Sequence, residues 1–108
     1  MVNQNLVNPV SVEKAYNELL ETFKIKNANY GNSFEKSLDK YGLIAALTRL
    51  SDKFNRAEEL LLKKDRKFSV GDESIRDTLM DMANYCVMTS VYLDGKSALK
   101  GGEQADGR

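Results

Sequence analysis

The chain has no histidine and no tryptophan, and only one cysteine and one proline among its 108 residues. Without histidine and with a single cysteine, it can form neither a zinc site of the usual type nor a disulfide within the chain. Cys86 falls on the apolar side of a predicted helix, so we expect a small buried hydrophobic residue and an intracellular setting. Any metal ion would have to be a hard cation held by carboxylates.

The net charge is zero, because 16 basic and 16 acidic residues cancel. This balance argues against binding to duplex nucleic acid, which needs a positively charged surface. No apolar run approaches the roughly 18 to 20 residues of a membrane span, and the first ten residues do not resemble a secretion signal. We therefore expect a soluble, cytoplasmic domain whose partner is a small molecule.

Helical periodicity dominates what remains, and it predicts an all-α bundle of three long helices and one short one. The long segments are residues 11 to about 26, Leu43–Leu62 and Asp72–Leu93, and the short one runs from Phe34 to about Lys40. Ser11 and Ser33 are expected N-caps, Gly42 separates the short helix from the next, and Gly95 is an expected C-cap. Residues 1–10 then form a flexible arm, residues 11–95 a single domain and residues 96–108 a disordered tail.

Each long segment carries an apolar stripe that should face the core. In the first the stripe is Val12, Ala15, Tyr16, Leu19, Leu20 and Phe23; in the second it is Leu43, Leu47, Leu50, Phe54, Ala57 and Leu61; in the third it is Leu79, Met82, Ala83, Cys86, Val87 and Leu93. So small a core would gain from pairing with further copies, and we expect a homodimer or higher homo-oligomer. Met80, Met88, Val91 and Tyr92 are candidates for that surface or, alternatively, for contact with the first helix.

Two charged strips lie beside these apolar stripes. Arg49, Lys53 and Arg56 share one face of the second long helix, and Asp77, Asp81 and Asn84 share one face of the third. If these helices pack antiparallel, as a short connection favours, the two strips could meet near one end. Their meeting would form either a ligand site or an interhelical salt-bridge ladder.

The segment KNANYGNSFEKS joins the first long helix to the short one and is the least regular part of the chain. Asn27, Gly31 and Asn32 are turn formers that tolerate positive φ. One interpretation is an interhelical turn followed by a cap. The other is a nucleotide-binding loop in which Tyr30 stacks on a base while Ser33, Lys36 and the helix N-terminus hold phosphate.

The motifs in residues 27–93 resemble the small nucleotide-modification-associated domain of phages and prophages. They are N-x-x-Y-G-x-S-F at Asn27–Phe34, R-x-x-x-K-x-x-R at Arg49–Arg56 and D-x-x-x-D-x-x-N-Y at Asp77–Tyr85. The resemblance implies a small all-α phage protein, at work in an infected bacterial cytoplasm, with a role connected to nucleotide or DNA modification.

The chain is more distantly similar to the all-α MazG-like nucleoside triphosphate pyrophosphohydrolases, which hold magnesium with an E-x-x-E pair and a later E-x-x-D pair. Asp77 and Asp81 match the later pair in part. At the earlier pair the chain has Lys53 and Arg56 instead of acids. Two carboxylates from one helix are few for a magnesium ion that must activate water, whereas cations suit direct phosphate binding.

Three functions follow, of which the first is favoured. The protein binds a nucleotide or nucleotide-derived ligand without a cofactor, either in nucleotide modification or to sequester a nucleotide signal of host defence. Alternatively, it is a magnesium-dependent pyrophosphohydrolase with Asp77, Asp81 and either Glu73 or Glu58 as ligands, or a non-catalytic interaction module. The candidate ligand-binding residues are Asn27, Tyr30, Ser33, Lys36, Arg49, Lys53, Arg56, Asp77, Asp81, Asn84 and Tyr85.

Overall fold

The computed structural model of the chain describes residues 5–62 and 73–103. Its elements, in chain order, are α1 (Pro9–Lys26), the π-helical turn η1 (Ala28–Asn32), α2 (Ser33–Tyr41), α3 (Ile44–Leu62) and α4 (Glu73–Glu103). These residues include no strand, so the predicted all-α class with three long helices and one short one is confirmed. In the same residues, no helix combines the length and apolar character needed to span a bilayer.

The helix α1 begins earlier than predicted, because Asn8 rather than Ser11 is its N-cap. The Asn8 side chain accepts a hydrogen bond from the Ser11 backbone N–H at 2.9 Å, and the Ser11 hydroxyl lies 3.1 Å from the Asn8 backbone N–H that donates to it. This is a reciprocal capping box, and Pro9 occupies the first turn, where its missing N–H costs nothing. The helix therefore includes part of the stretch predicted to be a loose arm.

The segment between α1 and α2 is helical, which corrects the predicted turn and cap. The Asn32 N–H donates to the Asn27 carbonyl at 2.9 Å, five residues back, and the Ser33 N–H donates to the Tyr30 carbonyl. Ser33 therefore does not cap a free helix end. Gly31 does not use positive φ, and it is required for another reason. A Cβ there would lie 2.8 Å from Cε1 of Phe23 and closer still to the Asn27 side chain.

Gly42 separates α2 from α3 as predicted. Its φ of 82° lies in the left-handed region, which favours glycine. Its N–H donates to the Leu38 carbonyl at 2.8 Å, closing the last turn of α2. The chain thereby turns sharply, and α3 runs back along α4.

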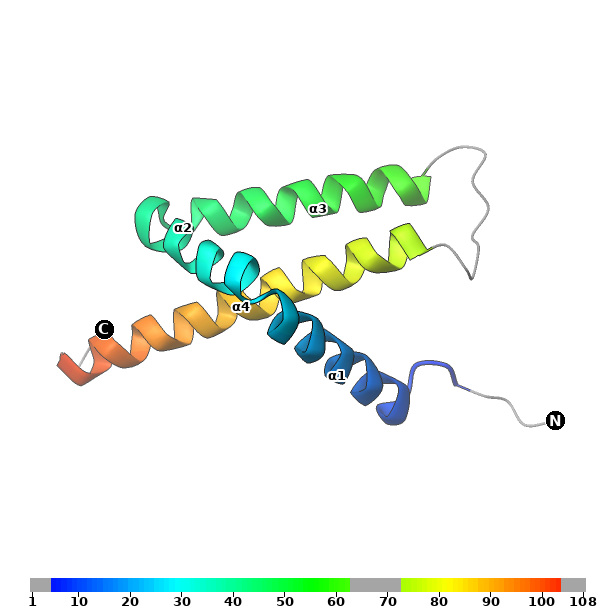
Figure 1. Cartoon of the computed structure of the whole chain (residues 1–108), viewed down its shortest axis with the longest axis horizontal. Helices are drawn as coiled ribbons and strands as arrows, with labels where there is room; N and C mark the ends of the chain where they lie inside the picture. The colour runs from blue at the N-terminus through cyan, green and yellow to red at the C-terminus, as the bar shows by residue number, and fades with distance from the viewer. Residues whose placement is uncertain (1–4, 63–72, 104–108) are drawn as a thin grey trace.

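The two longest helices pack side by side and antiparallel, as Figure 1 shows. The face of α3 that meets α4 differs from the predicted stripe. It is built around the small buried residues Ala46 and Ala57, with Leu50, Lys53 and Leu60 partly covered between and beside them. Alanine lets the two backbones approach, and the larger apolar residues are turned outward. Leu43, Leu47, Phe54 and Leu61 of the predicted stripe are each about half exposed.

The face of α4 is also shifted from the prediction. Ile75 and Thr78 are buried, and Met82, Tyr85, Met88 and Tyr92 are partly buried, whereas the predicted core residues Leu79, Cys86, Val87 and Leu93 are exposed. The small core joins Phe34 and Leu38 of α2 to Ala46 of α3, with Tyr85, Met88 and Tyr92 packed against it. Met88 and Tyr92 thus pack within the chain, but against α2 and α3, whereas the alternative interpretation expected contact with the first helix.

The helix α4 does not end at Gly95, which corrects the predicted C-cap. It continues to Glu103, so the first eight residues of the stretch predicted to be disordered are helical. In Figure 1 this end of α4 reaches beyond the other helices. Asp72, the predicted start of the helix, and residues 1–4 and 104–108 lie outside the described part of the chain.

Replacing Gly31 by alanine should destabilise the fold. The added Cβ has to displace the Phe23 ring and the Asn27 side chain, and such overpacking costs about 1 to 3 kcal/mol. Urea unfolding followed by circular dichroism measures the change in the free energy of unfolding.

The matched control is Ser33→Ala, two residues further on. Because Ser33 lies within continuous helix and its hydroxyl makes no hydrogen bond in the described structure, this substitution should not lower stability. A loss of about 1 kcal/mol at Ser33, the usual cost of removing an N-cap, together with an unchanged Gly31→Ala variant, would show that this segment is a capped turn and not a helix.

Candidate functional site

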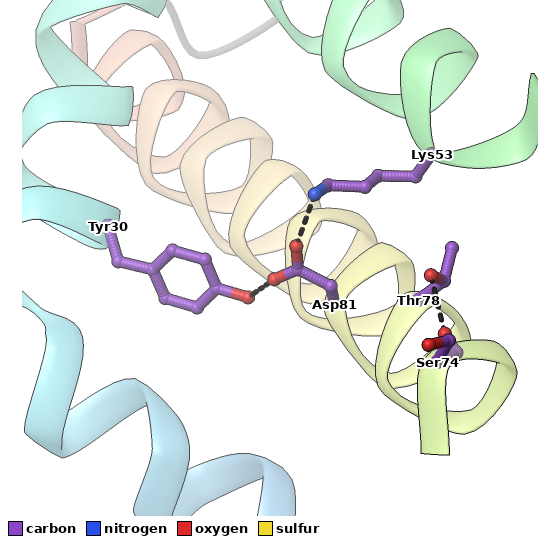
Figure 2. A network of polar contacts seen from close by, with 5 residues as sticks. All are labelled: Tyr30, Lys53, Ser74, Thr78 and Asp81. Carbon is purple, nitrogen blue, oxygen red and sulfur yellow. Dashed lines mark hydrogen bonds and ion pairs between the residues drawn. The ribbon is translucent and has the colours of Figure 1, made fainter. Parts of the chain in front are cut away.

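The centre of the candidate site is the carboxylate of Asp81, on the side of α4 that faces α3. One oxygen, Oδ2, lies 2.6 Å from Nζ of Lys53 on α3. The other oxygen, Oδ1, accepts a hydrogen bond from the hydroxyl of Tyr30 on η1. Figure 2 shows Lys53 and Tyr30 reaching Asp81 from two different elements. The predicted meeting of the two charged strips therefore occurs, at a single ion pair.

Tyr30 is held on all sides and is 8% exposed. Its ring meets Tyr85 edge to face, with centroids 5.3 Å apart, and Phe34 meets the same Tyr85 ring at 5.0 Å. Lys26 of α1 lies over the Tyr30 ring with Nζ 5.7 Å from the centroid. The expected role of Tyr30 as a stacking partner for a base does not fit this environment, because neither ring face is open.

Asn84 extends the polar network to α1. Its side-chain N–H donates to the Leu19 carbonyl at 3.2 Å, and the residue is 4% exposed. Asp81 and Asn84 are three residues apart and lie on one side of α4. The polar strip predicted on α4 therefore joins α3, η1 and α1, and the Asn84 side chain is engaged by the α1 backbone.

Burial, hydrogen bonds and neighbouring charges change the pKa values of Tyr30 and Asp81. Burial and the hydrogen bond to the Asp81 carboxylate raise the pKa of the Tyr30 hydroxyl far above its ordinary value of 10.0. Burial by itself raises the pKa of Asp81, but the hydrogen bonds from Lys53 and Tyr30 outweigh it and hold that pKa below 3.8. At neutral pH Asp81 is therefore a carboxylate and Tyr30 a neutral phenol.

The other two cations of the strip remain available. Arg49 and Arg56 are exposed, and within the described residues neither has a hydrogen bond or ion pair. They flank Lys53 along α3, four residues before it and three after it. Because a helix rises 1.5 Å per residue, the Cα atoms of Arg49 and Arg56 are about 10.5 Å apart along the helix axis. The arrangement is thus one fixed ammonium between two free guanidinium groups, and not a salt-bridge ladder.

The remaining predicted residues do not gather at this point. Asp77 is exposed on the turn of α4 before Asp81, and Ser33 and Lys36 are exposed on α2. Asn27 ends α1 and lies beside Gly31. No side-chain hydrogen bond or ion pair in the described structure joins these four to the Asp81 network. The predicted phosphate cradle at the start of α2 is also missing, since the Ser33 N–H is already bonded.

Two features of the site were not predicted from the sequence. One is Lys26, whose charge also lowers the pKa of Asp81. Lys26 precedes Tyr30 by four residues, and that spacing predicts a contact between the two side chains only if the segment between them is helical. The other is a second polar cluster, in which the Tyr92 hydroxyl donates to Asp39 at 2.8 Å and Lys96 lies 3.5 Å from the same carboxylate. It ties α2 to the end of α4 that was predicted to be disordered.

The described residues do not bring together the carboxylates that a magnesium site requires. No three acidic or cysteine side chains among them cluster. Glu58 is exposed on α3, and the side chain of Glu73 is outside the described part. Asp81 has both oxygens engaged by Lys53 and Tyr30, so a metal ion there would have to displace one of these partners.

Stability should fall above pH 10 because of Tyr30. Its pKa is higher in the folded state than the unfolded value of about 10, so its contribution is complete below pH 10 and is lost as the pH rises toward the folded value. Tyr30→Phe removes this contribution at all pH values. At pH 7 it should lower the free energy of unfolding by about 1.5 to 3 kcal/mol, the range for a hydrogen bond to a charged group.

The control is Tyr92→Phe, which also removes a tyrosine hydroxyl that donates to an aspartate, but in this case the aspartate, Asp39, is exposed. Its loss at pH 7 should be much smaller, since solvent screens the Tyr92–Asp39 contact. Urea unfolding at pH 7 and at pH 11 measures both variants. Two results would mean that the Tyr30 hydrogen bond is no stronger than a surface contact. One is an equal loss of unfolding free energy in Tyr30→Phe and Tyr92→Phe at pH 7. The other is a difference in unfolding free energy between wild type and Tyr30→Phe that is the same at pH 11 as at pH 7.

Comparison with known protein families gives a match that covers most of this architecture. Residues 26–93 match the family described as Nucleotide modification associated domain 1. The match begins just before η1, includes α2, α3 and the Asp81 network, and ends within α4. No characterised protein and no solved structure matches the chain at a significant level. Since the match spans well over half of its length, the chain belongs to the nucleotide-modification-associated domain 1 family.

Proposed function

We propose that this protein binds a nucleotide or nucleotide-derived ligand and holds its phosphates with Arg49, Lys53 and Arg56 of α3. The observation that carries the proposal is a pair of arginines, unpartnered within the part of the chain that the structure describes, on either side of a lysine fixed by Asp81. Membership of a family associated with nucleotide modification makes a nucleotide the first ligand class to consider.

The charges on α3 favour an anionic ligand. Guanidinium groups bind phosphate oxygens through paired, charge-assisted hydrogen bonds, and they keep their charge at any physiological pH. An arginine pair without carboxylate partners gains little as a structural element on a helix surface. Lys53 is already oriented by Asp81, so less side-chain entropy is lost when a phosphate binds beside it.

Binding is better supported than hydrolysis. A pyrophosphohydrolase would release a nucleoside monophosphate and pyrophosphate by attack of water on a bridged phosphate, and it would need magnesium held by several oxygen ligands. In the described residues Asp81 is occupied by a lysine and a tyrosine, and no three acidic or cysteine side chains cluster. A binder fits either of two roles, which are handling nucleotides during their modification and sequestering a nucleotide signal of host defence.

Replacing both arginines should abolish ligand capture. The protein is incubated with a mixture of nucleoside triphosphates, cyclic dinucleotides and NAD-derived nucleotides, with and without magnesium, and then filtered. Mass spectrometry of the filtrate, and of ligands released by heating the protein, identifies what was retained. We expect wild type to deplete at least one species, and Arg49→Ala/Arg56→Ala to weaken binding of that species at least tenfold, about 1.4 kcal/mol.

The control is Lys14→Ala/Lys40→Ala, which removes the same two charges from α1 and α2 and should bind as wild type does. Both variants should keep the wild-type unfolding midpoint, because all four side chains are exposed. Retention of ligand by the double arginine variant would remove this strip as the site. Magnesium-dependent release of a monophosphate and pyrophosphate would replace the binder with the enzyme.

A further inference from the structure

A wide groove lies between α1, α2 and α4, and the proposed function makes no use of it. Its volume is about 880 Å³, within the range of roughly 300 to 1,000 Å³ that small-molecule sites occupy. Most of its lining is apolar, and aromatic rings reach it from all three helices: Tyr16 and Phe23 from α1, Phe34 from α2 and Tyr92 from α4. A groove of this size and lining suits a ring-shaped molecule that packs against other rings.

The groove also contains a buried hydrogen-bond acceptor without a donor. Asn84 lines the groove and is 4% exposed. Its side-chain N–H donates to the Leu19 carbonyl at 3.2 Å, and no group in the described part of the chain donates to its Oδ1 oxygen. Since a buried amide oxygen normally accepts at least one hydrogen bond, a donor is expected to come from a molecule in the groove.

The Tyr30 hydroxyl shows which end of the Asn84 amide is left free. Burial first, and then the Asp81 carboxylate, raise the pKa of Tyr30, whereas the Asn84 side chain lowers it. A neighbour has this effect on a phenol when it donates a hydrogen bond to the phenol oxygen. An asparagine amide has two N–H donors and one oxygen. The Leu19 carbonyl and the Tyr30 oxygen therefore engage its N–H groups, and Oδ1 remains.

The apolar walls of the groove have no covering group in the described chain. Leu20 and Tyr16 of α1 are 50% and 65% exposed, and Val87 and Val91 of α4 are 51% and 63% exposed. A water molecule would satisfy the Asn84 oxygen, but it would leave these four side chains in contact with solvent. A molecule with an apolar body and one N–H donor satisfies the oxygen and also removes the walls from water.

The charges at the groove argue against an anionic occupant. Among the described lining residues Lys96 is the only cation, and its Nζ already lies 3.5 Å from the Asp39 carboxylate and 5.3 Å from the centroid of the Tyr92 ring. Glu35 adds a negative charge to the lining. A phosphate removed from water needs an unpaired cation beside it, and these residues do not supply one. The occupant is therefore uncharged.

We infer that this groove binds a small, uncharged aromatic heterocycle with an N–H donor, and that Oδ1 of Asn84 accepts a hydrogen bond from that N–H. A free nucleobase belongs to this class, and a nucleotide does not, because of its phosphate. The Arg49–Lys53–Arg56 strip contributes no residue to the groove. The inference is thus independent of the proposed function, and either can fail without the other.

Three ring compounds test the role of Asn84. Indole carries an N–H, N-methylindole lacks it, and skatole keeps the N–H but has a methyl group on carbon, which controls for size. Nuclear magnetic resonance titration of isotope-labelled protein measures each Kd and identifies the amide signals that move. Indole and skatole should shift the side-chain amide signals of Asn84 and bind about fivefold more tightly than N-methylindole, as expected for one neutral hydrogen bond.

Equal affinities for the three compounds would overturn the role of Asn84. If none of them binds, the inference fails, and the Asn84 oxygen is satisfied by water alone.

Substitutions that fill the groove test its position. Val87→Phe and Leu20→Trp enlarge side chains on two different walls, and each should weaken indole binding at least roughly tenfold, because the added ring takes the space beside Asn84. The matched control is Leu47→Phe, which enlarges an apolar side chain that is 59% exposed on α3, outside the groove. It should leave the Kd for indole unchanged.

Circular dichroism identifies a variant that fails to fold, and Leu20→Trp decides the matter if Val87→Phe is unfolded, since the two residues lie on different helices. Weaker indole binding in Leu47→Phe, with wild-type affinity in both groove variants, would assign the ring to the apolar face of α3 and overturn the inference. The groove variants should capture nucleotides as wild type does, because the arginines of α3 are unchanged.

Discussion

The carboxylate of Asp81 is the interaction on which the rest of this fold depends. It is partly buried, and a charge in that position is tolerated only when it is paired and hydrogen-bonded. Lys53 supplies the charge and Tyr30 the hydrogen bond, so α3 and η1 are both fixed to α4 at one residue. Asn84, one turn further on, fixes α1. Only a few side chains among the described residues are fully buried, so the small core cannot fix the positions of all the helices. This polar network positions the helices that the core does not.

The helices could be predicted from the sequence, but the faces they bury could not. Apolar periodicity located the helices within a few residues of their observed ends, except that α4 continues past the predicted C-cap Gly95 to Glu103. It then assigned Leu47 and Phe54 to the core, since large apolar residues normally bury the most surface. The structure instead buries Ala46 and Ala57, because the α3–α4 contact is a close approach of two backbones. Periodicity does not distinguish a stripe that meets its own chain from one that meets a partner.

The candidate site was predicted in part. The strips on α3 and α4 meet as expected, at Lys53 and Asp81. Turn-forming residues around Tyr30 suggested a loop, whereas the segment is a π-helical turn in which Tyr30 is buried. Whether a polar residue supports the fold or faces a ligand depends on which partners lie within hydrogen-bonding distance, and residue spacing alone does not give that. Family membership, and two arginines of α3 that have no hydrogen bond or ion pair among residues 5–62 and 73–103, are what make a nucleotide the proposed ligand.

The coupling between Lys53 and Tyr30 tests the central role of Asp81 most directly, because the two side chains both bind this carboxylate and no hydrogen bond joins them in the described structure. The measurement is a double-mutant cycle of Lys53→Met and Tyr30→Phe, followed by urea unfolding, with the same cycle repeated in an Asp81→Asn background. We predict that the two losses are non-additive by at least about 0.5 kcal/mol, and that the coupling disappears when the carboxylate is replaced. Additive losses in the wild-type background would contradict the account, because they would mean that α3 and η1 are held to α4 independently.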